Sequence, residues 1–181
     1  EKAANFMLWK SIEGKYYTPD EYTTKVAEQQ TDKDGFTIML YVDDVEGKDS
    51  FVEAAKAKGY DILELNGQLD SHYIQYYETK HEKVRFVRVD SDVVENLIRK
   101  EERAAMSLTS EQQDIMRPVF ESQMPHEEKI TYHISFEAMS ADAAPVVITQ
   151  NEFMRRMKEM AATSGGDMSR FYGQMPDNFT I

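Results

Sequence analysis

The sequence contains no cysteine among its 181 residues, which excludes disulfide bonds and thiolate metal sites. No run approaches the ~18 consecutive apolar residues that a membrane-spanning helix needs. Three motifs are also missing: the G-x-x-x-x-G-K-[ST] phosphate loop, the G-x-G-x-x-G dinucleotide fingerprint and the G-x-S-x-G nucleophile elbow. We therefore expect the chain to bind no nucleotide or other cofactor, and not to be an enzyme by itself.

Basic residues are scarce relative to acidic ones, with 21 Lys and Arg against 33 Asp and Glu and a net charge of −12. Both halves of the chain are acidic, so the total hides no basic domain. Such a surface repels phosphate backbones and anionic lipids, which argues against nucleic acid and membranes as partners. The four histidines show no i, i+4 spacing of a helical metal site, so we expect no metal site from them.

Residues 1–92 alternate between strand-like and helix-like segments, which predicts an α/β fold. Apolar runs typical of buried strands occupy residues 36–42, 60–65 and 84–89. Helix-like segments connect these runs, so the strands should be parallel with right-handed crossovers. The first part, residues 1–92, is therefore predicted to be a small three-stranded parallel sheet with flanking helices.

Helices are also expected at the start of the chain, over residues 2–12 and 19–29. Thr18-Pro19-Asp20-Glu21 is a strong helix start, because Thr18 can cap, Pro19 needs no N–H donor there and Glu21 can complete a capping box. The helix over 50–58 should stop at Gly59, a residue suited to the left-handed position after a helix.

Residues 93–105 are predicted to form a helical linker, and residues 106–181 a small α+β domain with a short antiparallel or mixed sheet. A helix should start at Thr109 or Ser110 with Gln112 or Gln113 at the matching third position, and Pro118 should kink or split it. The other elements expected here are strands over 130–136 and 146–149, a helix over 151–163 stopped by Gly165-Gly166, and a strand beginning at Phe179.

An acidic cluster is expected at one edge of the parallel sheet, where the strands end. Asp43 and Asp44 follow the first strand, and Asp90 and Asp92 follow the third. Ligands of open parallel sheets bind at that edge, and carboxylates can hold Mg²⁺, so one alternative is a receiver-like, metal-binding signalling module. The other interpretation is that these residues are turn and cap residues, since the two further strands of a receiver are missing here.

Methionine is concentrated in the second part, where nine of the eleven fall between Met106 and Met175. On the helix over 151–163, four apolar residues form one arc about 120° wide at ~100° per residue. These residues are Phe153, Met154, Met157 and Met160. The arc fits either a stripe packed on its own core or an adaptable binding surface, because thioether side chains repack against varied partners. For a binding surface, at least two of the four should be substantially exposed.

Several segments in order resemble the bacterial form of the ninety-kilodalton heat-shock chaperone family. Ser11–Tyr22 is similar to a family segment in which a helical hairpin precedes a strand. Lys56–Leu65 is similar to a family segment in which lysines and a glycine precede an apolar strand. Leu69-Asp70 and Ala144–Thr149 also match in order and spacing. The resemblance extends through the whole chain, which makes it more specific than any single motif.

The resemblance implies the end of the family's middle domain followed by most of its C-terminal domain, truncated before the dimerisation helices. Since the chain starts at Glu1 without an initiator Met or signal peptide, we expect it to be an internal piece of a longer protein. The family implies an ATP-dependent, cytoplasmic, homodimeric chaperone whose ATP and Mg²⁺ bind in a domain outside this chain. It also implies that Phe153, Met154, Met157 and Met160 contact unfolded client proteins.

Overall fold

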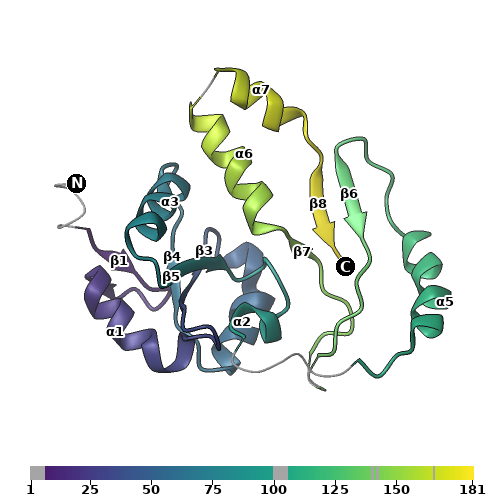
Figure 1. Ribbon diagram of the computed structural model, residues 1–181, viewed down its shortest axis with the longest axis horizontal. Helices are drawn as coiled ribbons and strands as arrows, with labels where there is room; N and C mark the ends of the chain where they lie inside the picture. Colours follow the sequence, from purple (N-terminus) through teal and green to yellow (C-terminus); the bar gives the residue numbers. More distant parts are fainter. Residues whose placement is uncertain (1–6, 100–105, 140, 142, 165) are drawn as a thin grey trace.

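The computed structural model describes residues 7–99, 106–139, 141, 143–164 and 166–181. A parallel sheet with its helices lies on the left of Figure 1, and a second sheet lies on the right. Helix α6 (Glu152–Ser164) lies between them and contacts α3 (Asp70–Lys80) on one side and β8 (Asp177–Thr180) on the other. This placement makes α6 the element that joins the two parts.

The first sheet has the order β4-β3-β5, and both outer strands run parallel to the central β3. Alternate residues of β3 enter two separate cores: Met39 and Tyr41 face one, and Ile38, Leu40 and Val42 face the other. Burial on both faces explains why this strand is uniformly apolar. The predicted three-stranded parallel sheet is confirmed; its strands are β3 (Thr37–Val42), β4 (Ile62–Glu64) and β5 (Val84–Arg88).

Helices cover both faces of this sheet. Helix α1 (Pro19–Gln30) and α3 contribute to the core around Met39, whereas α2 (Asp49–Ala57), which follows the short η2 (Glu46–Lys48), and α4 (Val94–Leu97) contribute to the other. The predicted capping box of α1 is confirmed, since Thr18 N donates to the Glu21 carboxylate at 2.8 Å and Glu21 N to Thr18 Oγ1 at 3.3 Å. Gly59, just after α2, has φ +78°, as expected for a residue that ends a helix.

The start of the chain differs from the prediction. Strand β1 (Trp9–Lys10) pairs antiparallel with β2 (Tyr16–Tyr17), so the helix expected over 2–12 is wrong for its described part, residues 7–12. Trp9 is 1% exposed and its ring lies 5.1–5.8 Å from the rings of Tyr22, Tyr77 and Phe86. Residues 11 and 12 also pair with β4. These distant partners override the local preference for a helix.

The second part contains a mixed sheet of order β6-β8-β7, in which β8 runs parallel to β6 and antiparallel to β7. This confirms the α+β class, although β6 (Ile130–His133) and β7 (Thr149–Gln150) are shorter than expected. Helix α5 (Ser110–Glu121) starts with the expected capping box of Thr109 and Gln112 and continues through Pro118 without being split. Helix α7 (Gly166–Gln174) was not predicted, because the glycine pair before it resembles a helix end.

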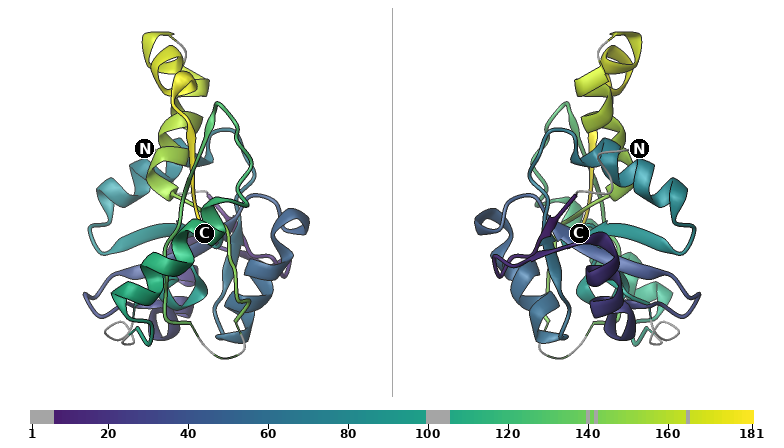
Figure 2. Two further views of the ribbon diagram at one scale, coloured as in Figure 1. Left: turned by 90° about the vertical axis from the view of Figure 1, so that its right-hand side faces the viewer. Right: turned by 90° about the vertical axis from the view of Figure 1, so that its left-hand side faces the viewer.

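The boundaries predicted for the two domains and the linker stay a prediction. Hydrogen bonds cross the expected division, because Gln150 N donates to Asp90 O at 3.1 Å just before α6 begins. Views from the two sides show α6 rising beside α3, with α7 at its far end (Figure 2). Within the described ranges, none of the helices is both long enough and apolar enough to cross a membrane.

Candidate protein-binding surface on helix α6

Helix α6 has three sides with different surroundings. Its polar side, which includes Arg155 and Arg156, is buried against the first part. Lys158 points to the second sheet, where its ammonium nitrogen lies 2.6 Å from a carboxylate oxygen of Asp177 in β8. The apolar residues occupy the remaining side. The structure therefore buries two arginines, although the charged side of a surface helix is usually solvated.

Arg156 docks α6 onto the free edge of β5. Its guanidinium donates to the backbone carbonyl of Phe86 and, at 3.0 Å, to the carboxylate of Glu78 in α3. The other Glu78 oxygen accepts a hydrogen bond from Phe86 N at 2.7 Å. Both backbone polar groups of Phe86 are therefore bonded by side chains on the edge away from β3. An unpaired strand edge is a site of unwanted strand pairing, and these two side chains protect it.

One carboxylate oxygen of Glu152 accepts hydrogen bonds from three donors. Tyr41 Oη lies at 2.6 Å, Arg156 Nε at 2.5 Å and an Arg155 nitrogen at 3.1 Å, and Arg155 also donates to Tyr41 Oη. Burial raises the pKa of Glu152, but the positive charges of Arg156 and Arg155 outweigh it, so the pKa lies below its ordinary value. Burial, with the charge of Glu152, raises the pKa of Tyr41, which keeps the phenol protonated as a donor.

The second half of α6 also contacts α3 through polar side chains. Ser71 Oγ donates to the carboxylate of Glu159, and His72 Nε2 lies 2.7 Å from Thr163 Oγ1. Arg155 also donates to Glu159 and so links the two halves of the helix. Hydrogen bonds between α6 and the first part thus extend from Glu152 to Thr163.

The four apolar residues of α6 are not enclosed to the same degree. Phe153 is 65% exposed, whereas Met154, Met157 and Met160 are partly buried. The expectation that at least two of them would be substantially exposed is therefore wrong, because only Phe153 is. None of the four is fully buried, and together they form an apolar stripe on one side of α6 (called the stripe below). Its role in binding stays a prediction.

The acidic residues at the strand ends are held by neighbouring cations and backbone groups. Arg88 donates to Asp90 at 2.5 and 2.8 Å and to Asp43 at 2.9 Å, and Lys48 also donates to Asp43. Burial raises the pKa of Asp43, but Lys48 and Arg88 outweigh this and lower it below its ordinary value. Asp92 accepts from Val93 N and from Asn96. Within the described part of the chain, no three His, Asp or Glu residues are grouped as metal ligands would be. This arrangement does not favour the receiver-like alternative built on Asp43, Asp44 and Asp90.

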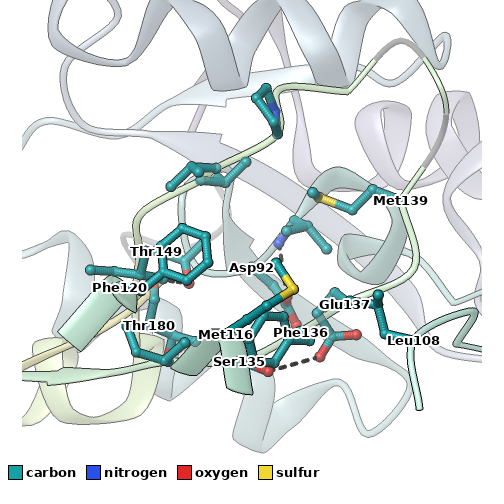
Figure 3. A pocket seen from close by; sticks show the side chains of 16 residues that line it. Asp92, Leu108, Met116, Phe120, Ser135, Phe136, Glu137, Met139, Thr149 and Thr180 are labelled. Atoms are coloured by element: carbon teal, nitrogen blue, oxygen red, sulfur yellow. Dashed lines mark hydrogen bonds between the residues drawn. The ribbon is translucent and has the colours of Figure 1, made fainter. Parts of the chain in front are cut away.

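An apolar cavity of about 240 Å³ lies between α5, the segments beside the mixed sheet, and residues Asp92 and Val93. Figure 3 shows Met116 and Phe120 of α5 close to Phe136. The rings of Phe120 and Phe136 are 6.3 Å apart, and Met139 lines the far side. Sequence analysis did not single out this cavity, because its lining comes from short segments without a common periodicity.

The sequence is similar to curated proteins along its entire length, although no protein-family model matches it. The chaperone protein HtpG of Porphyromonas gingivalis is 46% identical over 181 residues, which are 100% of this chain and 26% of that protein. HtpG proteins of Bacteroides thetaiotaomicron and Bacteroides fragilis match at the same identity and coverage. The chain belongs to the HtpG chaperone family. It spans about a quarter of the length of these relatives, so it represents a segment of an HtpG protein.

Membership in the HtpG family confirms the resemblance inferred from the sequence and leaves the receiver-like alternative without support. The polar residues that hold α6 in place were missed by the sequence analysis. Their one signal was the pair Arg155-Arg156 in an otherwise methionine-rich helix, and its partners lie 70 to 114 residues away in the sequence.

Proposed function

We propose that this chain is the part of an HtpG chaperone that presents α6 to unfolded or partly folded client proteins. In the proposed whole protein, ATP and Mg²⁺ bind in a domain outside this chain, and two copies pair as a homodimer in the cytoplasm. The chain itself contributes binding surface and scaffold, not catalysis. The similarity to HtpG chaperones over all 181 residues supports the chaperone role.

The observation that carries the binding role is that α6 is held by its polar side. A surface helix usually packs its apolar stripe on the core of its own domain. In α6 the buried residues are Arg155 and Arg156 on the polar side and the small Ala161 on the apolar side, while Phe153 is 65% exposed. Aromatic and methionine side chains supply contact area that adapts to partners of different shape, as an unfolded client requires.

Replacing Phe153 with serine tests this role directly. The binding partner is a permanently unfolded protein, reduced and carboxymethylated α-lactalbumin, and affinity is measured by fluorescence anisotropy. We predict that Phe153→Ser weakens binding at least about fivefold, the equivalent of the more than ~1 kcal/mol expected for an anchor residue of an interface.

The matched control is Ile115→Ser in α5. Ile115 is 74% exposed, so the substitution removes a similar apolar group from the surface of another helix. It should leave binding unchanged. Equal affinities of Phe153→Ser and the unsubstituted chain would contradict the proposed role of α6, and an equal loss in both variants would show that binding is not specific to this helix.

A further inference from the structure

The docked side of α6 fixes the rotation of the helix about its own axis. Arg156 donates to two different elements, α3 through Glu78 and β5 through the Phe86 carbonyl. Arg155 donates to Tyr41 of β3 and to Glu159 of α6 itself. A guanidinium has a planar, rigid fork of donors, so contacts to several groups at once are satisfied in one orientation only.

This orientation determines where the stripe points. At ~100° per residue, the centre of the stripe lies about 130° around the helix from the centre of the docked polar side. The docked side bonds to the first part, and Lys158 pairs with the second sheet on a third side. A change in the polar contacts would therefore turn the stripe or free it from its present direction.

The polar contacts favour specificity over strength. The desolvation cost of a buried ion pair offsets much of its attraction, whereas its geometry is demanding. Glu152 Oε2 and Arg155 Nε are buried without a hydrogen-bond partner among the described residues, which lowers the net stabilisation further. The surface uncovered by separation is charged and readily hydrated, unlike an apolar interface. These properties suit a contact that is made and released.

We propose that Glu152, Arg155 and Arg156, with Tyr41 and Glu78, form a polar latch that positions the stripe relative to the parallel sheet. They are positioning residues: they act on a client through the orientation of α6 and do not touch it. The role of the latch in client binding rests on the function proposed above, whereas its role in holding α6 does not. The latch would transmit a movement of the sheet-containing first part to the binding surface.

The first arm of the test measures the position of α6 without any client. Because the chain contains no cysteine, Gln75→Cys in α3 and Ala162→Cys in α6, both exposed, give one specific pair of spin labels. We expect a single narrow distance distribution for the labelled chain. The variants Arg155→Ala with Arg156→Ala, and separately the milder Tyr41→Phe, should broaden it. Lys158→Ala should leave it unchanged, because Lys158 pairs with Asp177 and not with the first part.

Fluorescence of Trp9, the single tryptophan, shows whether the first part of each variant remains folded, since its ring lies against Tyr77 and Phe86. If the double arginine variant unfolds, the distance distribution of the Tyr41→Phe variant tests the latch in its place. An unchanged distance distribution in folded variants would overturn the latch.

The second arm measures binding of reduced, carboxymethylated α-lactalbumin to the same variants without labels. We expect the double arginine variant to bind at least about fivefold more weakly, the lower end of common couplings between two sites, and Lys158→Ala to bind normally. A broadened distribution with unchanged binding would overturn the positioning role. The effect of Phe153→Ser on binding tests the proposed function separately from the latch, because that substitution removes a stripe residue and leaves the latch residues in place.

Discussion

At the scale of single residues, Glu152 is the point on which the contact between the two parts depends. Its carboxylate accepts from Tyr41 and from both neighbouring arginines, and its pKa is lowered relative to the ordinary value of 4.5 although burial acts in the opposite direction. A carboxylate whose pKa is lower in the folded state stabilises that state above the unfolded pKa. This contribution is lost as the pH falls through the folded pKa.

We therefore predict that the free energy of unfolding decreases as the pH is lowered below about 4.5, and that Glu152→Gln reduces this dependence. At neutral pH the variant should be less stable by about 3 kcal/mol, the lower end of the cost of breaking a buried ion pair. Urea unfolding followed by Trp9 fluorescence and circular dichroism at several pH values measures both effects.

The control for this prediction is Glu53→Gln, because Glu53 is exposed and pairs with Lys56 on the surface of α2. It should change the stability little at any pH. The same pH dependence in Glu152→Gln as in the unsubstituted chain would show that the Glu152 carboxylate does not have the assigned role.

At the scale of elements, α6 combines a docked polar side with an incompletely buried apolar side. Met157 and Met160 are partly buried, so they contribute less to stability than core residues. We predict that Met157→Gln with Met160→Gln lowers the free energy of unfolding by less than the ~2–5 kcal/mol typical of truncating one buried methionine, while it weakens binding of unfolded protein.

The matched control for this stability measurement is Met39, a methionine that is completely buried in β3. Met39→Gln places an amide in that core and should destabilise the chain more than the double substitution in α6. Chemical denaturation of both variants gives the two values. If the double variant in α6 unfolds first, the stripe is part of a core and the binding interpretation is wrong.

Most elements could be predicted from the sequence because their signals are local. The capping residue Thr18, the glycine after α2 and the uniformly apolar β3 all act within a few residues. The start of the chain could not, because Trp9 belongs to β1 through aromatic contacts with residues 13 to 77 positions away. Helix α7 was missed since Gly166 begins it instead of ending α6.

Of the candidate site, the stripe could be predicted from the sequence, but the latch could not. Helical spacing identifies the stripe, because the four residues share one side of a single helix. The latch depends on Tyr41, Glu78 and Phe86, which come from three other elements of the first part. A charged face on a helix is normally solvated, and no local pattern distinguishes the present exception.

At the scale of the whole molecule, two sheet-containing parts share one helix. Figure 1 shows that α6 follows β7 of the second sheet. Its buried arginines, however, bind Tyr41 and Phe86 in strands of the first sheet. This arrangement places an apolar stripe beside the junction of the two parts, where a relative movement would alter it most. The central proposal for this molecule is that unfolded protein binds at this stripe.

Methyl NMR of the methionines tests this claim most directly, because the eleven methionines include three in the stripe and one in the core of the first sheet. The chain is labelled at the methionine methyl groups and titrated with reduced, carboxymethylated α-lactalbumin. We predict that the signals of Met154, Met157 and Met160 shift or broaden with added protein, whereas the signal of Met39 does not change. Shifts confined to Met116 and Met139, which line the apolar cavity, or no shifts at saturating protein, would contradict the account.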